Sequence, residues 1–319
     1  MARGQRAEDT FTKGADTAPL RVGDLARVAS EKDTFHRTAF NVAYPGGALH
    51  LGSKTHVMGI LNVTTDSFYD GKRYYATKDA VNHGLTLAAE GADIIDVGGE
   101  STRPGAHPMP EADELKRVIP VVKALSKQIK IPVSIDTYKA SVAEKAIEAG
   151  ASIINDIGGL TMDKRMAAVA AAAKVPIIIM HKKGAPKTMQ RRPMRRVKAL
   201  PEIISYLKKS VAIAAKNGIE SDKIILDPGI GFGKTALHNL EILKGLKELS
   251  LIGFPLLIGT SRKNFIRTIL DVSIEESLYG TLATVAIAAM NGAHIVRVHD
   301  VRAAVQVVTI CDAVMNQTA

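Results

Sequence analysis

The sequence has few of the residues that build disulfide-bonded, membrane-spanning or base-stacking proteins. Its 319 residues include one cysteine, Cys311, which excludes an internal disulfide and suits a reducing cytoplasm. No run reaches about 18 apolar residues, the length that crosses a membrane, and the N-terminus lacks the apolar core of a signal peptide. We therefore expect a cytoplasmic protein without a membrane partner, whose 46% hydrophobic content can bury a full core.

Aromatic residues make up only 4% of the chain, although the net charge is +10. Part of that charge lies in the basic stretch 182–198, KKGAPKTMQRRPMRRVK. Nucleic-acid binding is one interpretation of such a stretch. No aromatic residue stands among these charges to stack on bases, so we expect no nucleic-acid partner and favour a solvated loop that attracts a small anion.

A phosphate-binding loop is also missing, although DPGIGFGKT (227–235) resembles one. The P-loop pattern would place its first glycine at position 228, which is Pro228. Proline has no N–H to offer a phosphate. The carboxylate of Asp227, at the end of an apolar strand, is the residue of interest here.

From about residue 57 the chain repeats a short apolar strand, a polar loop and a helical segment. Eight such strands begin near residues 57, 93, 132, 152, 176, 223, 255 and 294. Their near-continuous apolar runs are typical of a parallel sheet buried on both faces. The pattern predicts an α/β fold, a (β/α)8 TIM barrel. A doubly wound sheet is the main alternative, but the glycine-rich turn after its first strand is absent.

The first fifty residues have a different composition. Residues 1–38 are polar and predict a flexible N-terminal extension, which leaves 39–319 for the barrel. The segment 40–52 has two alternating runs around Pro45-Gly46-Gly47. It predicts a β-hairpin, which we expect to cap the bottom of the barrel.

Polar residues gather where the strands end, which is the position of active sites in this fold. They are Asn62, Asp96, Asp136, Asn155 with Asp156, His181, Asp227, Ser261 to Lys263, and Arg297 with His299. Each has a structural explanation as well: Asp136 or Thr137 could cap the helix that begins near Lys139. We keep the structural explanation for three of them, with Asp96 and Asp156 as buried partners of backbone amides and His181 as a core histidine.

Taken together, the strand-end residues indicate a small polar ligand. Asp136, Asn155 and Asp227 offer acceptors and a carboxamide that suit the edge of a nitrogen heterocycle. The cationic and hydroxyl residues of the last two strands stand where TIM barrels often bind phosphate. These are Ser261, Arg262, Lys263, Arg297 and His299. Asn62, Thr102 and Arg103, on the first two loops, can serve the same anion or a metal bound to it.

Two other barrel chemistries are less compatible with the sequence. A metal-dependent hydrolase would need a His-x-His pair at an early strand end, and there is none. A Schiff-base aldolase needs a buried lysine at a strand end, and Lys263 keeps that alternative open.

The motifs resemble those of the dihydropteroate synthases. In family order they are MGILNVTTDSFYDG (58–71), GADIIDVGGESTRPGA (91–106), SIDT (134–137), INDIGG (154–159), DPGIGFGKT, GTSRK (259–263) and RVHDV (297–301). The similarity spans about 48–312. It implies an enzyme, usually a homodimeric (α/β)8 barrel, that joins 6-hydroxymethyl-7,8-dihydropterin pyrophosphate to para-aminobenzoate with Mg²⁺ and is a target of sulfonamides.

The resemblance also implies roles for individual residues. Asp136, Asn155, Asp227 and Lys263 would bind the pterin ring, and Asn62 would help to hold Mg²⁺. Thr102, Arg297 and His299 would bind the pyrophosphate, with Arg103 beside them. Ser261, Phe68, Phe232 and Pro104 would form the aminobenzoate pocket. Catalysis would consist of positioning and electrostatic stabilisation without a protein nucleophile.

Several positions depart from the family pattern. Thr65 replaces a proline, Tyr69 a serine and Lys72 a glycine, and Lys182-Lys183 replaces Met-Gln. Loss of the proline predicts a looser first loop. Methyltetrahydrofolate-corrinoid methyltransferases share the pterin fold, but the ESTRPGA and GTSRK segments favour the synthase.

Overall fold

The computed structural model describes residues 37–63, 77–101, 107–184 and 198–317, and the structural statements below concern these residues. Two elements come before the main sheet and form a separate two-stranded sheet, β1 (Phe40–Tyr44) and β2 (Gly47–Leu51). The predicted extension 1–38 lies outside the described residues except for Arg37 and Thr38. Arg37 is buried, so the packed structure begins at or before this residue and not at residue 39 as predicted.

The main sheet consists of eight parallel strands in chain order. They are β3 (His56–Asn62), β4 (Ile94–Gly98), β5 (Val133–Asp136), β6 (Ile153–Asp156), β7 (Ile177–Met180), β8 (Ile224–Asp227), β9 (Leu257–Ile258) and β10 (Ile295–Val298). β10 pairs with both β9 and β3, and a parallel bridge between Leu226 and Leu256 joins β8 to the start of β9. The ring is therefore closed, and the predicted TIM barrel is confirmed.

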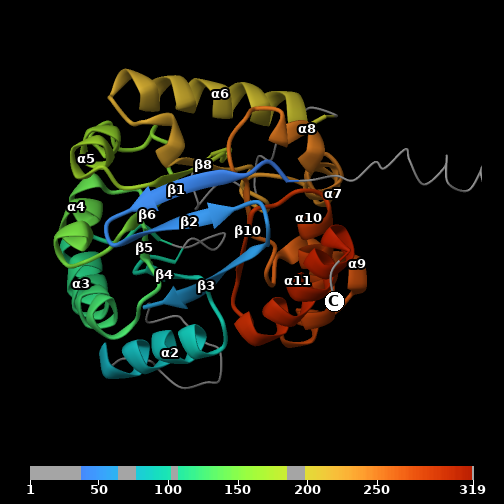
Figure 1. The fold of residues 1–319 in the computed structure, drawn as a ribbon, viewed down its shortest axis with the longest axis horizontal. Helices are drawn as coiled ribbons and strands as arrows, with labels where there is room; N and C mark the ends of the chain where they lie inside the picture. Colours follow the sequence, from blue (N-terminus) through green and yellow to red (C-terminus); the bar gives the residue numbers. More distant parts are fainter. Residues whose placement is uncertain (1–36, 64–76, 102–106, 185–197, 318–319) are drawn as a thin grey trace, which may run out of the picture. The chain divides into compact units, whose positions relative to one another are not determined.

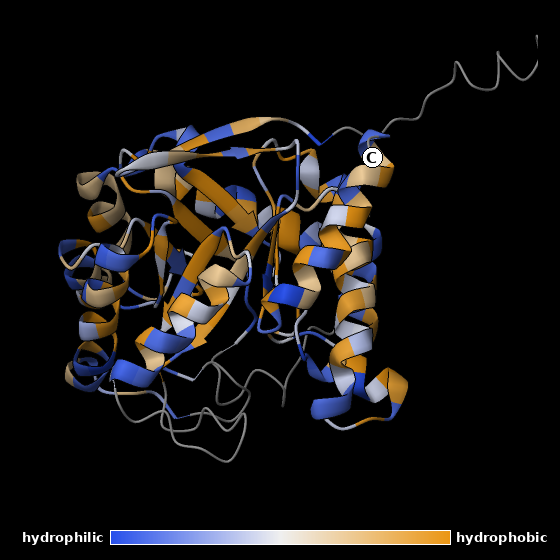
Figure 2. Cartoon of the chain, turned by 60° about the horizontal axis from the view of Figure 1, so that its bottom comes forward, coloured by the Kyte–Doolittle hydropathy of each residue, from blue (hydrophilic) through white to orange (hydrophobic). Residues whose placement is uncertain are grey.

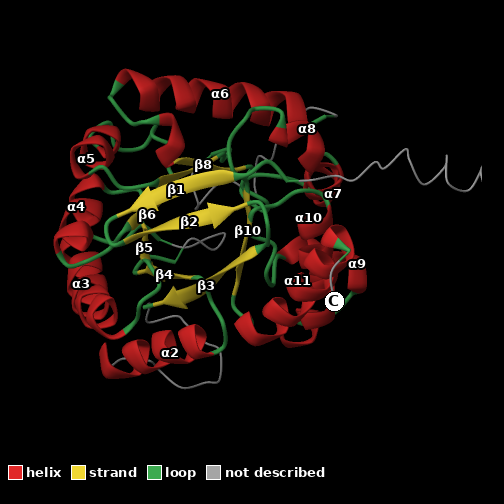
Figure 3. Ribbon diagram, viewed as in Figure 1, coloured by secondary structure: helices red, strands yellow, loops and turns green. Residues whose placement is uncertain are grey.

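Helices surround the strands, as Figures 1 and 3 show. They are α2 (Thr77–Ala89), α3 (Glu111–Gln128), α4 (Ala140–Glu148), α5 (Met166–Ala173), α6 (Leu200–Lys216), α7 (Ala236–Lys244), α8 (Leu246–Ser250), α9 (Asn264–Leu270), α10 (Leu278–Met290) and α11 (Val301–Asn316), with 3-10 turns η1 (Ser221–Lys223) and η2 (Glu275–Ser277). Apolar side chains of strands and helices form one buried layer between them. The apolar strands inside the ring of helices are visible in Figure 2.

Glycines end several helices as the sequence predicts. Gly91, Gly150, Gly218 and Gly292 have φ of 100°, 113°, 83° and 100°, in the left-handed region that glycine adopts without strain.

The hairpin of β1 and β2 covers the N-terminal ends of the barrel strands. Val42, Leu49 and Leu51 belong to one buried cluster with inward side chains from the starts of the strands, among them Ile94 and Ile295. The Lys223 ammonium, in the turn before β8, donates a 2.5 Å hydrogen bond to the Ala43 carbonyl. The hairpin therefore closes the bottom, which leaves the opposite end for a ligand.

Candidate active site

The alternation of side chains along the strands places a polar layer directly above the apolar one. Ile94, Ile153 and Ile295 point into the lower core. The residues two positions later, Asp96, Asn155 and Arg297, share that inward direction because successive side chains of a strand point to opposite faces.

Arg297 connects two carboxylates at this level. Its Nε donates to Asp96 Oδ2 and its Nη2 to Asp136 Oδ2, each at 2.6 Å. Asn155 Nδ2 donates to the same Asp96 oxygen at 2.9 Å. The side chains of Asp96, Asp136 and Asn155 are all buried. Four strands thus contribute to one charged network.

Each carboxylate keeps one oxygen for another donor. Among the described residues, Asp96 Oδ1 and Asp136 Oδ1 are buried without a hydrogen-bond partner. Leaving a buried acceptor unsatisfied costs about 1–3 kcal/mol. Two such oxygens on the neighbouring strands β4 and β5 suit a ligand edge that carries several N–H groups.

Burial shifts the proton affinities of these groups. It raises the pKa of Asp136 to about 7, although the neighbouring Arg297 acts in the opposite direction. It also raises the pKa of Asp227, against the Gly229 amide and Lys263. Burial lowers the pKa of Lys263 to about 8, helped by the charge of Arg297. The site therefore holds an acid, Asp136, and a base, Lys263, whose pKa values lie near neutral pH, which is common in active sites.

A second group of residues lies at the ends of β8 and β9. The Asp227 carboxylate accepts from the Gly229 amide at 2.6 Å. The Lys263 ammonium lies 4.3 Å from the centre of the Phe232 ring, within cation–π distance. The structure thus brings together Phe232 and Lys263, which the resemblance assigns to the two different substrates.

Ser261 and His299 form a third group, across the last two strands. Ser261 Oγ lies 2.9 Å from His299 Nδ1, and the His299 amide donates to Ser261 Oγ at 3.2 Å. Arg262, the residue after Ser261, has a left-handed φ of 56°. Its guanidinium forms a two-point ion pair with Asp300, the residue after His299. This pair fixes the loop after β9 against the loop after β10.

Other predicted site residues are placed partly or not at all. Asn62 ends β3 and is half-buried. Phe68, Thr102, Arg103 and Pro104 lie outside the described residues, as do Thr65, Tyr69 and Lys72. Most of the basic stretch lies there too, although Lys183 is seen in a 2.8 Å ion pair with Glu202.

The structure corrects two interpretations made from the sequence. Asp96 is not a partner of backbone amides but a member of the Arg297 network; its inward direction follows by alternation from Ile94, whose inward face the structure shows. Neither Asp136 nor Thr137 caps α4 itself: the Thr137 hydroxyl accepts only from the amide of Lys139, the residue before the helix, and the amide of the first helical residue, Ala140, bonds to Asp163.

The structural explanation holds for the other two residues of that group. Asp156 accepts from the amides of Gly158 and Leu160, each at 2.6 Å. His181 is buried, and its Nδ1 lies 2.8 Å from the Lys234 ammonium.

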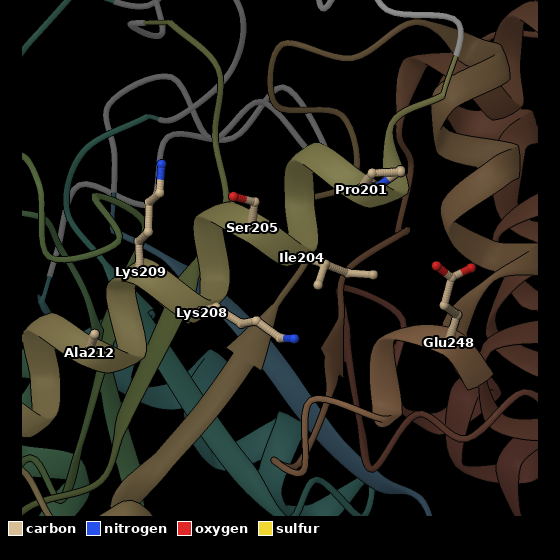
Figure 4. Close-up of a pocket in the computed structure, with 7 residues that line it drawn as sticks. All are labelled: Pro201, Ile204, Ser205, Lys208, Lys209, Ala212 and Glu248. Atoms are coloured by element: carbon tan, nitrogen blue, oxygen red, sulfur yellow. The ribbon is translucent and has the colours of Figure 1, made fainter.

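A hollow of about 610 Å³ lies elsewhere, on the outside of the barrel between α6 and α8. Figure 4 shows Ile204 and Lys208 of α6 on one side of it and Glu248 of α8 on the other. No residue of the polar layer lines this hollow. Among the described residues, no helix is long and apolar enough to cross a membrane.

Comparison with known proteins identifies the family. A family model described as pterin binding enzyme matches residues 58–299. The dihydropteroate synthase of Bacillus subtilis (strain 168) is 48% identical over 271 residues, which is 85% of this chain and 92% of the relative. The dihydropteroate synthase of Escherichia coli (strain K12) is 45% identical, over 83% and 93% of the two chains.

The chain belongs to the dihydropteroate synthase family of pterin-binding enzymes.

Solved members of the family have the same fold. The Yersinia pestis dihydropteroate synthase with a sulfonamide drug complex matches with a TM-score of 0.83 and 39% identity, over 88% of this chain and 100% of that one. The Xanthomonas albilineans dihydropteroate synthase with 4-aminobenzoic acid matches with a TM-score of 0.81 and 39% identity, over 87% of this chain and 98% of that one. As a dihydropteroate synthase family member the chain is a transferase of folate synthesis.

Proposed function

We propose that the pterin ring of 6-hydroxymethyl-7,8-dihydropterin pyrophosphate binds at the polar layer of the barrel. The two buried, unpartnered oxygens of Asp96 and Asp136 are the observation that carries this proposal. A pterin edge presents adjacent ring and amino N–H groups, which two carboxylates can accept. Asn155 and Asp227, on the following strands, would contact the rest of the ring.

Para-aminobenzoate would bind beside the pterin, between Phe232 and Ser261. An aromatic ring supplies a flat apolar contact, and the Lys263 ammonium, which lies over the Phe232 ring, would separate the two substrates. Phe68 and Pro104 would complete this pocket. A sulfonamide that imitates the arylamine would compete for the same space.

The proposed reaction is a displacement at the pterin methylene carbon. The bond from this carbon to the pyrophosphate oxygen breaks, and its electron pair leaves with pyrophosphate. The amine nitrogen of para-aminobenzoate forms the new bond and then loses a proton to water. Arg297, His299, Thr102 and Arg103 would stabilise the leaving charge. One well-placed donor of this kind contributes about 2.7–4 kcal/mol.

The residues present fit a magnesium ion that arrives with the substrate. Mg²⁺ is usually bound through one or two protein oxygens together with substrate phosphates and waters. The described residues contain no group of three or more His, Cys, Asp or Glu that could enclose a metal. The Asn62 carboxamide, at the strand end, would supply a protein oxygen. When bound, the ion neutralises charge on the pyrophosphate.

The exposed apolar residues support a homodimer. Most of the large exposed hydrophobic side chains among the described residues lie on or next to α7, α9, α10 and α11. They are Leu237, Leu240, Ile269, Leu270, Tyr279, Ile287, Met290, Ile310 and Val314. A concentration of this kind marks an interaction surface. Tyr279→Glu combined with Ile310→Glu should reduce the mass in sedimentation from dimer to monomer, and an unchanged mass would place the interface elsewhere.

We further propose that the protein acts in the cytoplasm, where its single, buried Cys311 would stay reduced. Detection of this protein in a membrane or secreted fraction would contradict that proposal.

The activity test is pyrophosphate release from dihydropterin pyrophosphate and Mg²⁺, with and without para-aminobenzoate. Release that depends on the arylamine, with dihydropteroate as product, is the expected result. Pterin binding without release would contradict the proposed chemistry and favour the methyltransferase alternative. If borohydride traps a carbonyl substrate covalently on Lys263, the aldolase alternative would be favoured.

A further inference from the structure

Lys234 is a buried lysine that the proposed reaction does not use. It lies in the loop between β8 and α7 and is 3% exposed. Its ammonium lies 2.7 Å from the Gly229 carbonyl oxygen and 2.8 Å from His181 Nδ1. The Phe232 and His181 carbonyl oxygens follow at 3.3 and 3.4 Å. One ammonium thus connects both ends of the 229–233 loop to the end of β7.

The loop rests directly on the segment that follows β7. Gly229 and Gly233 have φ of 69° and 67°, which side chains rarely adopt. A β-carbon at Gly229 would collide with the His181 carbonyl oxygen, and one at Gly233 with the Lys183 carbonyl oxygen. The two glycines therefore permit a backbone contact that Lys234 holds by hydrogen bonds.

Phe232 lies between these two glycines. Its position follows from the loop backbone, and its ring lies against the Lys263 ammonium. The stem of Lys263 covers Gly231, where a β-carbon would lie 3.1 Å from Lys263 Cδ. The loop held by Lys234 thus sets the position of the aromatic ring and supports the lysine beside it.

We propose that Lys234 is a positioning residue for arylamine binding, which fixes the Phe232 side of the para-aminobenzoate pocket by tying the 229–233 loop to His181. This proposal rests on the proposed function. Lys234 touches neither substrate nor the reacting atoms in this scheme. The start of the loop has its own anchor, the bond from the Gly229 amide to Asp227, so the pterin site depends less on Lys234 than the arylamine pocket does.

The state of His181 offers a readout that is independent of activity. Burial, and then the charge of Lys234, hold the pKa of His181 far below its usual range. A neutral imidazole that accepts at Nδ1 carries its proton on Nε2. The ¹⁵N shifts of His181 should show this tautomer in the wild-type protein.

The main experiment compares Lys234→Met with Lys145→Met. Lys145 is an exposed lysine of α4 that pairs with Glu148 of the same helix. Lys234→Met should raise KM for para-aminobenzoate by about 10- to 100-fold, because a shift of about 1 Å in a positioning element can have an effect of this size. KM for dihydropterin pyrophosphate and kcat at saturation should stay within about threefold. Lys145→Met should change none of these values.

A second variant guards against misfolding. Lys234→Gln keeps two donors but no charge and should give an intermediate KM for the arylamine, together with partial retention of slow amide exchange in 229–233. Lys234→Met should lose the His181 tautomer preference and exchange faster in this loop.

Three results would overturn the proposal: an unchanged arylamine KM in Lys234→Met, an equal rise of both KM values, or a fall of kcat with unchanged KM. Failure of the proposed function has a different signature, since the wild-type protein would then release no pyrophosphate in response to the arylamine. The His181 shifts and loop exchange would still report whether Lys234 holds the loop.

Discussion

Asp136 and Arg297 together determine how the polar layer behaves. The guanidinium stabilises a carboxylate whose pKa burial raises to about 7. Asp136 must be ionised to accept two N–H groups at once. The pH dependence of pterin binding should therefore report this residue.

Pterin affinity of the wild-type protein is expected to fall as the pH drops through about 7, where Asp136 takes up a proton. Asp136→Asn should weaken pterin binding by about 10- to 100-fold, from the loss of a charge-assisted acceptor, and should remove this pH dependence. Calorimetric titration from pH 5.5 to 8.5 measures both effects. Asp113→Asn, an exposed carboxylate on α3, serves as the control. The same pH slope in Asp136→Asn would assign it to another group.

His294 makes stability depend on pH at the bottom of the barrel. Its Nδ1 accepts from the Leu256 amide at 3.1 Å, and its Nε2 lies 3.0 Å from the Thr38 carbonyl oxygen, which a ring N–H can satisfy. Burial lowers its pKa to about 4. The unfolded chain, with an ordinary histidine, binds the proton first as the pH falls. Stability from this group is therefore complete above about pH 6.5 and declines towards pH 4.

The free energy of unfolding should drop by about 3 kcal/mol over that range. His294→Gln, which keeps a donor and an acceptor but does not titrate, should flatten the decline in urea titrations at pH 7, 5.5 and 4.5. His50→Gln, at an exposed position of β2, should leave the slope unchanged. If both variants keep the wild-type slope, other acidic or basic groups account for it.

At this scale the sequence predicted most of the polar layer but not its bonds. Asn155, Asp227 and Arg297 were expected because they end strands. Asp96 was missed, since the apolar run DIIDVGG does not show which face its aspartate occupies. That face depends on where the strand enters the sheet, and a shift of one residue reverses it. The hydrogen bonds of Lys234 to Gly229 and His181 depend on a loop conformation that no sequence periodicity predicts.

Among the elements, the hairpin of β1 and β2 has the clearest separate task. It closes the bottom of the barrel with three apolar side chains, one of which is Leu49. Leu49→Ala should lower the free energy of unfolding by about 2–5 kcal/mol, as a large-to-small change in a core does. Denaturant titration measures the loss.

The same variant should keep the wild-type KM for both substrates, because the hairpin lies at the opposite end of the strands from the polar layer. His50→Ala, which alters the exposed face of β2, is the matched control for stability. A large change in KM without loss of stability would show that the bottom of the barrel influences the site.

Strand positions were predicted closely, since each observed strand begins within two residues of its expected start. Buried parallel strands are apolar on both faces, and glycines mark the preceding helix ends, so both signals are local. The exception is the seventh strand, expected from Pro255 onwards but reduced to Leu257–Ile258. The backbone before this strand bonds to both neighbouring strands in turn. The Pro255 carbonyl accepts from the Leu226 amide on one side, and the Leu256 carbonyl accepts from the His294 amide on the other. Sequence alone cannot specify such sharing.

Besides the Arg297 network, a buried ion pair in the described barrel joins the two residues Arg37 and Asp312, near the two ends of the described chain. Arg37 pairs with Asp312 of α11, and Thr55 also bonds to this carboxylate, through its amide at 2.6 Å and its hydroxyl at 2.8 Å. The side chain of Arg37 is 1% exposed. This cluster fastens the segment before the hairpin to the last helix.

Asp312→Asn should destabilise the protein by about 3–5 kcal/mol, because it leaves the buried guanidinium without its counter-charge. Lys54→Met, which removes an ion pair on a lysine that is 56% exposed, should change stability by less than about 1 kcal/mol. Thermal and urea unfolding of the two variants measure the contrast. Equal effects would mean that the Arg37 cluster is hydrated.

The closure of the strand ring has one consequence for motion. β3 and β4 are paired along five residues, from Met58 to Asn62, whereas β8 and β9 meet through the single bridge of Leu226 and Leu256. Local opening requires least free energy where the fewest backbone bonds must break. Asp227 ends one side of this joint, and Ser261 follows the other. The closed ring therefore has its weakest joint between the strand that ends in Asp227 and the strand that precedes Ser261, two residues that we propose to contact different substrates.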